Sequence, residues 1–377
     1  MKKLVVGITA PGSVILIVGQ LKYFKSLGYE TYLLAPTDEK VTDYCEREGC
    51  IHLPVNLERE ISPIKDAKAL VQIIKHLKRV KPDVVNFGTP KVSLLGMMAA
   101  KMLGIKNRIY TCRGFRFETE KGKKRKLLIF LEKVTSKFSH QVICISPSLK
   151  LFGIKLDIFP ENKSFVINKG SSNGINLLRF NPEKIDQSEV VTLKSDLSIS
   201  GNFCYGFIGR LSDEKGINEL FFAFDNLYKD NKNLKLLLIG SIDNAQIGNK
   251  SIIENIKTHE GIIFLGHQSN IPLYLSLFDV FVMPTHREGF GNVFVEAAAM
   301  GLPVIGTDVT GSKDAVSKDY NGLLIPAKSA SLLQEAMLGL YNDEAKRNEL
   351  GSNGIEWAKN FDSKMIWDSM DELYRKQ

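Results

Sequence analysis

Two carboxylic acids lie on either side of a glycine-rich turn in the segment Pro284–Glu296. Glu288 comes just before Gly289 and Gly291, and Glu296 follows them. A loop carboxylate can accept hydrogen bonds from hydroxyl groups, while the amides at the start of a helix bind anions and favour a nearby acid. Each acid alone is equally well explained by solvation or by the helix dipole. Together they indicate an anion site with two acids beside it.

The elements around this turn are predicted to be a strand, a loop and a helix. Val280–Met283 is a short β-branched and aromatic run, which is typical of a buried strand. Val293–Met300 contains successive alanines and favours a helix. The two acids are therefore expected where a strand ends and a helix begins.

Two cations occupy an equivalent position earlier in the chain. Arg210 and Lys215 follow the strand-like run Cys204–Ile208 and precede a helix expected to begin at Ile217. A helix N-terminus with two flanking cations is suited to a pyrophosphate group. The simpler alternative is a pair of solvated loop cations, but their order relative to Glu288 favours a phosphate site.

Taken together, these segments closely resemble the retaining glycosyltransferases of family four, the group-one glycosyl transferases, in their bacterial surface and capsular polysaccharide subgroup. The resemblance covers essentially the whole C-terminal half. It is carried by the paired acids Glu288 and Glu296, Phe207–Leu211, Glu214–Gly216, Phe264–His267, Gly301–Ile305 and Asn321–Leu323.

The resemblance implies roles for individual residues. Glu288, Arg210 and Lys215 are expected to be catalytic, with the cations offsetting charge on the departing diphosphate so that no metal and no cofactor is needed. Glu296 is expected to bind the ribose of the nucleotide. The other expected donor contacts are Gly289, Phe290, Gly291, Asn292, Val293, Gly12, Ser13, Gly209, Leu265 and His267. Gly12 and Ser13 are equally well explained by a plain strand-to-helix turn.

Short apolar strands alternate with helices in both halves, which predicts an α/β protein with parallel sheets covered on both faces. The resemblance specifies the GT-B fold, with two doubly wound Rossmann-like domains facing across a cleft. The expected domains are residues 1–170 and 171–359, with a last helix at 360–377 packing back on the first. The polar stretch Lys169–Asn202 lacks periodic runs and is interpreted as the connection, and a capped helix is expected from Ser13.

The segment Arg113–Thr119 departs from the family pattern, because many members have a His near its first position. An arginine does not accept a proton at neutral pH, but it can bind a phosphate through two nitrogens. Arg113 and Arg116 are therefore interpreted as ligands for a donor or acceptor phosphate. A salt bridge with Glu118 or Glu120 is the alternative.

A basic cluster follows, and it leads into an apolar helix that begins near Leu127. This order suits contact with an anionic membrane surface or with a lipid pyrophosphate. The alternative is a solvated loop beside a helix with a buried apolar face. The cluster consists of Lys121, Lys123, Lys124, Arg125 and Lys126, of which Lys123, Lys124 and Arg125 are the expected contacts.

Composition limits the partners. The 377 residues carry a formal net charge of +8, which points to an anionic partner. No aromatic residues are interleaved with a basic stripe, so nucleic acid is not expected. The apolar run after Met1 resembles a secretory signal but is broken at Pro11, and no apolar stretch is long enough for a membrane span. We expect a cytoplasmic protein, peripheral on the inner face of the membrane. The five cysteines are interpreted as buried thiols, and none shows paired metal-ligand spacing.

The resulting hypothesis is a retaining hexosyl or N-acetylhexosaminyl transferase that uses a UDP-sugar, with an N-acetylhexosamine or its deoxy relative as the donor sugar. The acceptor is expected to be an undecaprenyl-pyrophosphate-linked sugar in capsule or O-antigen-type polysaccharide assembly. Transfer to a soluble sugar phosphate or small metabolite is the competing enzyme hypothesis, and a nucleic-acid-binding protein is the remote one.

Overall fold

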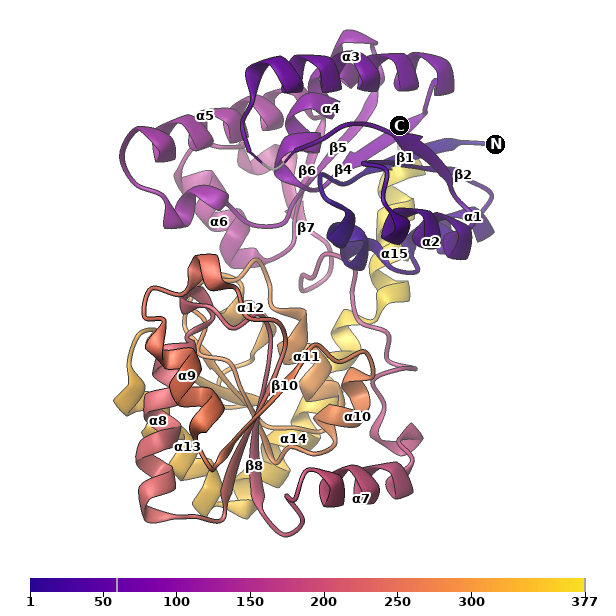
Figure 1. Ribbon diagram of the computed structural model, residues 1–377. Coiled ribbons are helices and arrows are strands. Elements are labelled where there is room, and N and C mark those ends of the chain that lie inside the picture. Colours follow the sequence, from indigo (N-terminus) through magenta and orange to yellow (C-terminus); the bar gives the residue numbers. More distant parts are fainter. Residues whose placement is uncertain (59, 376–377) are drawn as a thin grey trace. The chain divides into compact units, whose positions relative to one another are not determined.

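The computed structural model describes residues 1–58 and 60–375. The chain forms two compact units, one made of residues 1–174 and 363–375, the other of residues 175–362 (Figure 1). The sequence places the first boundary at 170/171, whereas the units divide at Gly174/Ile175. Lys376 and Gln377, the end of the expected last helix, lie outside the described residues.

The first unit is built on a seven-stranded parallel sheet in the order β3-β2-β1-β4-β5-β6-β7. The five inner strands are buried along nearly their whole length, as expected for a sheet covered on both faces. The strands are β1 (Lys3–Gly7), β2 (Glu30–Ala35), β3 (Ile51–Pro54), β4 (Val84–Phe87), β5 (Asn107–Cys112), β6 (Gln141–Cys144) and β7 (Ser164–Val166).

Helices cover both faces of this sheet (Figure 1). Right-handed crossovers send the chain to one face before β2 and β3 and to the other face afterwards. One face carries α1 (Gln20–Ser26), α2 (Glu39–Glu48) and α15 (Ser363–Arg375). The other carries α3 (Pro63–Val80), α4 (Pro90–Met102) and α5 (Gly122–Phe138), and α6 (Pro147–Lys155) connects β6 to β7. Three short 3-10 turns lie at Pro11–Ile17, Arg116–Thr119 and Glu161–Lys163.

The C-terminal helix α15 is part of the core of the first unit. Ile366, Met370 and Tyr374 are buried with β1, β2 and α1. The Tyr374 hydroxyl accepts a hydrogen bond from Asn86 at 2.7 Å, which ties α15 to the middle of the sheet. A segment from the end of the chain therefore completes the hydrophobic core of the N-terminal unit.

The second unit contains a six-stranded parallel sheet in the order β10-β9-β8-β11-β12-β13. The central strand β8 is closely packed: a Cβ at Gly206 would lie 1.9 Å from the Phe278 ring, so no larger side chain fits there. The strands are β8 (Phe203–Ile208), β9 (Leu234–Ile239), β10 (Ile262–Gly266), β11 (Val280–Val282), β12 (Val304–Thr307) and β13 (Gly322–Ile325).

Two helical layers cover this sheet as well (Figure 1). One consists of α8 (Ile217–Asp230), α9 (Ser251–Thr258) and α13 (Ala330–Asn342), the other of α10 (Ile271–Leu275), α11 (Asn292–Ala299) and α14 (Glu344–Ala358). The unit also contains α7 (Gln187–Asp196), α12 (Ser312–Ala315) and 3-10 turns at Pro182–Lys184, Asp213–Lys215, Asn244–Gln246 and Lys359–Phe361.

Two local expectations are wrong. The residues from Ser13 form a 3-10 turn, and α1 begins only at Gln20, after Gly19 adopts φ 79°. The presumed connection Lys169–Asn202 contains α7, whose first turn is capped by Asp186 accepting a hydrogen bond from the Ser188 amide. This helix has little apolar periodicity, so its sequence gave no helical signal.

The structure also bears on the expectations for the cysteines and for membrane-spanning segments. All five cysteines are buried free thiols, as predicted. Within the described residues, no helix combines the length and apolar character needed to cross a bilayer.

Candidate functional site

The predicted acids and cations meet at one place in the second sheet. Strands β8 and β11 are neighbours, yet the chain leaves β8 toward β9 and leaves β11 toward β12, in opposite directions. The loops at their carboxyl ends therefore diverge, and such a switch point is where open α/β sheets bind ligands. Arg210 and Lys215 lie in the loop after β8, and Glu288 lies in the loop after β11.

Three side-chain pairs link the loop after β8, together with the first turn of α8, to the loop after β11. Lys215 Nζ contacts Glu288 Oε1 directly, and the two side chains are only 17% and 15% exposed. Arg287 Nη2 donates to Glu214 at 3.4 Å. His286 Nε2 lies 3.0 Å from Glu219 Oε1. We call these three pairs the loop ladder.

The backbone under the loop ladder is fixed by close packing and hydrogen bonds. The His286 amide donates to the Glu214 carbonyl at 2.7 Å. The buried Thr285 hydroxyl donates to the same carbonyl at 3.1 Å. Gly216 has φ 72°, and a Cβ there would lie 2.0 Å from the Pro284 carbonyl oxygen. Only glycine lets the two loops approach this closely.

Arg210 is held by an acid of the same unit. Its Nη1 donates to Asp243 Oδ2 at 2.6 Å, with the arginine side chain half exposed. Both predicted phosphate-binding cations are thus paired with carboxylates, Arg210 with Asp243 and Lys215 with Glu288. An exposed pair of this kind is worth little, so a doubly charged ligand can replace Asp243 at small cost.

The glycine-rich turn forms the predicted helix start. Gly291 is the N-cap of α11 with φ 89°, and Asn292 and Val293 begin the helix. The Phe290 side chain is only 2% exposed and packs against Phe361, with ring centroids 5.2 Å apart. A ligand can therefore reach Phe290 only through its backbone, and the aromatic ring anchors the turn.

Glu296 lies on α11, and its carboxylate has no hydrogen-bond partner among the residues that the structure describes. Burial raises the pKa of Glu296 to about 7, and the charge of Arg179 opposes this rise. A partly buried carboxyl that titrates near neutrality is poised to accept hydroxyl donors from a ligand.

Gly209, Leu265 and His267 lie at the same carboxyl edge of the sheet. The Gly209 amide donates to Ile239 at 2.9 Å. Leu265 is the penultimate residue of β10, and Gly266, the last, has φ 65° and accepts a hydrogen bond from the Gly240 amide at 2.7 Å. His267 is exposed. The structure thus gathers all the donor-site residues predicted in the second half on one edge.

The remaining predicted residues belong to the first unit. Gly12 and Ser13 lie in the 3-10 turn after β1, and Arg113 follows β5. Within residues 1–58 and 60–375, no acidic side chain forms an ion pair with Arg113, and its role as a phosphate ligand stays a prediction. Arg116 Nη2 lies 3.2 Å from Glu60. Lys123, Lys124 and Arg125 occupy the first turn of α5.

Sequence reasoning missed four residues of the loop ladder: Glu214, Glu219, His286 and Arg287. A signal was present, because acids and cations alternate in the two loops with opposite signs. It could not be read without knowing that β8 and β11 are neighbours.

The arrangement of metal-ligating side chains bears on the predicted absence of a metal. Among residues 1–58 and 60–375, no group of three or more His, Cys, Asp or Glu side chains is arranged to hold a metal ion.

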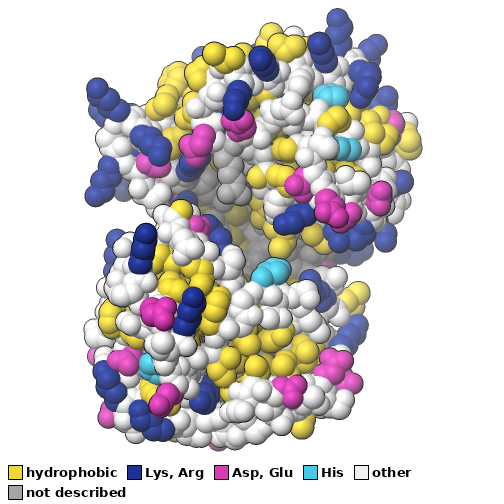
Figure 2. Space-filling model, viewed as in Figure 1, with side chains coloured by type: hydrophobic (Ala, Val, Ile, Leu, Met, Phe, Trp, Pro, Cys, Tyr) yellow, Lys and Arg dark blue, Asp and Glu magenta, His cyan; other side chains and the backbone are white. Residues whose placement is uncertain are grey.

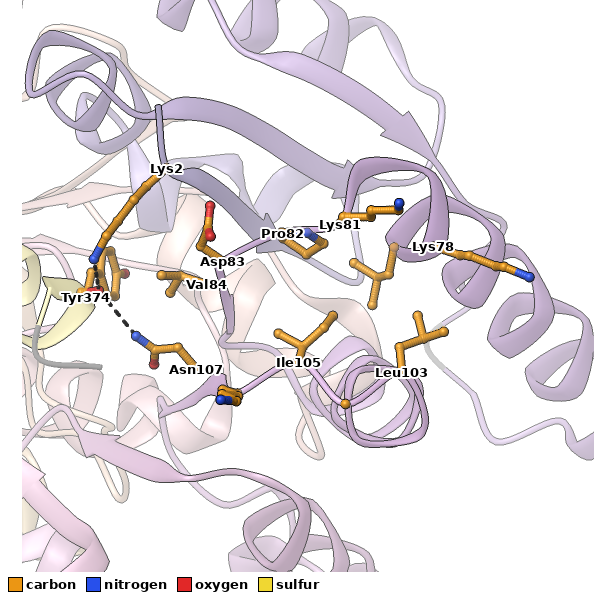
Figure 3. Close-up of a pocket in the computed structure, with 13 residues that line it drawn as sticks. Lys2, Lys78, Lys81, Pro82, Asp83, Val84, Leu103, Ile105, Asn107 and Tyr374 are labelled. Atoms are coloured by element: carbon orange, nitrogen blue, oxygen red, sulfur yellow. Dashed lines mark hydrogen bonds between the residues drawn. The ribbon is translucent and has the colours of Figure 1, made fainter.

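A pocket of about 520 Å³ lies at the amino ends of β4 and β5, lined by residues including Lys2, Asp83, Asn107 and Tyr374 (Figure 3). It contains none of the predicted site residues and lies at the edge of its sheet opposite to the carboxyl ends.

Comparison with known proteins agrees with this geometry. Residues 193–357 match the family described as glycosyl transferases group 1, and residues 9–146 match glycosyl transferase 4-like proteins. The chain is 33% identical to the capsular polysaccharide biosynthesis glycosyltransferase CapM of Staphylococcus aureus, over 97% of this chain and 95% of the relative. It is 30% identical to the UDP-Gal:alpha-D-GlcNAc-diphosphoundecaprenol alpha-1,3-galactosyltransferase of Escherichia coli, over 84% and 81%.

Among solved structures, Anabaena HepE in complex with UDP has a TM-score of 0.81 at 18% identity, covering 99% of both chains. The two parallel Rossmann-like units therefore define the GT-B class of transferases. The chain belongs to the group 1 glycosyl transferases of family four, in their capsule and surface polysaccharide type. It is accordingly a glycosyltransferase of polysaccharide biosynthesis.

Proposed function

We propose that the protein is a retaining, metal-independent transferase that moves a sugar from a UDP-sugar to an undecaprenyl-diphosphate-linked sugar. The observation that carries the proposal is the meeting of Lys215 with Glu288 at the switch point between β8 and β11. The name of the E. coli relative supports a UDP donor and a diphosphoundecaprenol acceptor.

The two loops divide the work on the donor. When the donor binds, its diphosphate replaces Asp243 as the partner of Arg210 and Glu288 as the partner of Lys215. Both cations then offset charge on the departing UDP. The Glu288 carboxylate, once released from Lys215, accepts hydrogen bonds from the sugar hydroxyls. Glu296 accepts hydrogen bonds from the ribose. The other two pairs of the loop ladder, Arg287 with Glu214 and His286 with Glu219, hold the two loops together while Lys215 changes partner.

The chemical step follows from these roles. Glu288 and Glu296 are both used for hydroxyl binding, so neither serves as a nucleophile. The acceptor hydroxyl bonds to the anomeric carbon on the face from which UDP departs, and its proton passes to the leaving phosphate oxygen. The bond between the anomeric carbon and that oxygen breaks, which retains the configuration.

The identity of the donor sugar is the least constrained part. We propose an N-acetylhexosamine or its deoxy relative, and UDP-galactose, the donor named for the E. coli relative, is the second sugar to test. Transfer to a soluble sugar phosphate remains the competing function, and the behaviour of α5 on membranes separates the two.

Glu288→Gln should lose most of the transfer rate and keep its affinity for UDP. The variant removes the charged acceptor of the sugar hydroxyls, worth about 2 to 4 kcal/mol in the transition state, but it leaves Lys215 free for the diphosphate. Lys215→Ala and Arg210→Ala should weaken UDP binding itself. Calorimetry with UDP and initial rates of UDP-sugar turnover measure both effects.

The exposed acid Glu335 on α13 provides the matched control, and Glu335→Gln should match the parent protein in both assays. Parental transfer rates in Glu288→Gln would remove Glu288 from the site. Unchanged UDP affinity in both cation variants would place the diphosphate elsewhere.

The affinity for UDP should rise about tenfold from pH 6 to pH 8 because of Glu296. Its pKa is raised to about 7 by burial, so at pH 6 a proton must leave before the carboxylate can accept the ribose hydroxyls. Above the pKa this cost disappears. Glu296→Gln should retain only the smaller dependence due to the phosphate of UDP, whose pKa is about 6. Parallel pH profiles for the two proteins would contradict a role for Glu296 in nucleotide binding.

Helix α5 has the surface expected of a membrane contact. Its first turn carries several cations and no acid, although the positive end of the helix dipole disfavours cations there. Leu127 and Phe130 are 46% and 59% exposed beside them. Figure 2 shows Lys and Arg side chains gathered over this part of the first unit. We therefore propose that α5 rests on an anionic bilayer while an acceptor is bound.

Replacing Lys123 and Lys126 with Gln should weaken sedimentation with phosphatidylglycerol vesicles about thirtyfold, because each basic residue near such a surface is worth about 1 kcal/mol. These two are chosen because Lys124 is paired with Glu120 and Arg125 stacks over Phe117. Leu127→Ser with Phe130→Ser should act in the same direction. Val191→Ser, which changes an exposed apolar residue of α7, is the control. Equal vesicle binding by all variants would favour the soluble acceptor.

A further inference from the structure

Arg113 is an arginine without an acidic partner. Its side chain forms no ion pair and no hydrogen bond within residues 1–58 and 60–375, and its Nε is buried. The groups that influence its charge are Tyr374, Tyr110 and Cys112, which are neutral at pH 7. Lys91, a cation of the same unit, differs in this respect, since it is paired with Asp66 at 2.6 Å.

An unpaired cation in a partly buried position is costly to keep. Burial lowers the pKa of Arg113 to about 10, which shows that its surroundings oppose the charge. Proteins normally pair such charges or remove them. The absence of a partner therefore indicates a site prepared for an anion that comes from outside the chain.

Contacts with the residues at the end of β4 fix the position of the Arg113 guanidinium. The guanidinium lies directly on Gly88 at the end of β4, where a Cβ would be 1.6 Å from Nη1. The turn after Gly88 is fixed by Thr89, whose hydroxyl oxygen accepts from the Thr9 amide at 2.7 Å. The Thr9 hydroxyl in turn accepts from the Val92 amide at 3.1 Å, which secures the start of α4.

The chain connects this arginine directly to the membrane-contact helix. Phe115 and Phe117 follow Arg113, are fully buried and stack with centroids 4.9 Å apart. Arg125 of α5 lies over the Phe117 ring at 5.5 Å. A rigid aromatic segment thus joins the unpaired arginine to α5 within one unit.

We propose that Arg113 binds the diphosphate of the lipid-linked acceptor. The proposal rests on the function proposed above and extends it to the acceptor. A guanidinium presents two parallel N–H donors to a phosphate, which suits bidentate binding. The donor diphosphate already has Arg210 and Lys215 in the other unit, and the unit that carries Arg113 also carries the α5 surface.

The test uses Arg113→Met in the full-length protein, with a polyprenyl-diphosphate-linked N-acetylglucosamine as acceptor. The KM for this acceptor should rise at least tenfold, while UDP affinity stays within twofold of the parent. Inorganic pyrophosphate should compete with the acceptor in the parent and lose this competition in the variant. Because an unpaired charge is removed, the Tm should be equal to or above that of the parent. Arg47→Met, on the exposed surface of α2, is the charge-matched control.

Gly88→Ala provides an independent test that keeps the arginine. Its methyl group must push the guanidinium aside, so the acceptor KM should rise as in Arg113→Met. Arg113→Lys should raise the acceptor KM less than Arg113→Met does, because the positive charge remains although the two parallel N–H donors of the guanidinium are lost.

Three results would overturn the proposal. A lower Tm with an unchanged acceptor KM in Arg113→Met would make the residue structural. A tenfold loss of UDP affinity with an unchanged acceptor KM would assign Arg113 to the donor. Parental acceptor kinetics in Gly88→Ala would show that the position of the guanidinium does not matter. If the parent protein itself transfers no sugar to the lipid acceptor, the proposed function fails, which is a separate outcome.

Discussion

The contact between Lys215 and Glu288 is the interaction on which the proposed site depends. It joins the loops after β8 and β11, which come close because the two strands are neighbours in the sheet. Gly216 makes the approach possible, and the pairs Glu214–Arg287 and Glu219–His286 flank it. The sheet order therefore sets the distance between the groups assigned to the diphosphate and to the sugar.

The two units treat charge in opposite ways. In the second unit, each cation assigned to the donor diphosphate has a carboxylate partner in the free protein, so binding is an exchange of partners and the empty site is electrostatically satisfied. In the first unit, Arg113 is left unpaired in a partly buried position. A cation that already has a carboxylate partner does not destabilise the free protein. An unpaired cation lowers the free energy of unfolding of the free protein, and it gains more free energy when an anionic ligand binds. This contrast would let donor and acceptor bind with different dependence on salt.

Sequence alone predicted the parallel α/β architecture and the strand-loop-helix setting of Glu288 and Glu296, because apolar runs and glycine turns are local signals. It did not predict the 3-10 turn at Pro11–Ile17 or helix α7, where the pattern is weak and caps decide the outcome. The ladder partners Glu219 and His286 lay beyond reach for another reason. They are 67 positions apart, and their contact depends on strand order. The surroundings of Arg113 likewise depend on tertiary structure, since Glu120, which is close in sequence, is paired with Lys124.

The stereochemistry of transfer is the sharpest test of the proposed mechanism, because both acids are assigned to hydroxyl binding and the departing diphosphate receives the acceptor proton. The measurement is the anomeric configuration of the product by NMR, made with an α-linked UDP-sugar in the presence of EDTA. We expect an α-linked product and full activity under chelation. A β-linked product, or activity lost on chelation and restored by magnesium or manganese, would contradict the proposed mechanism.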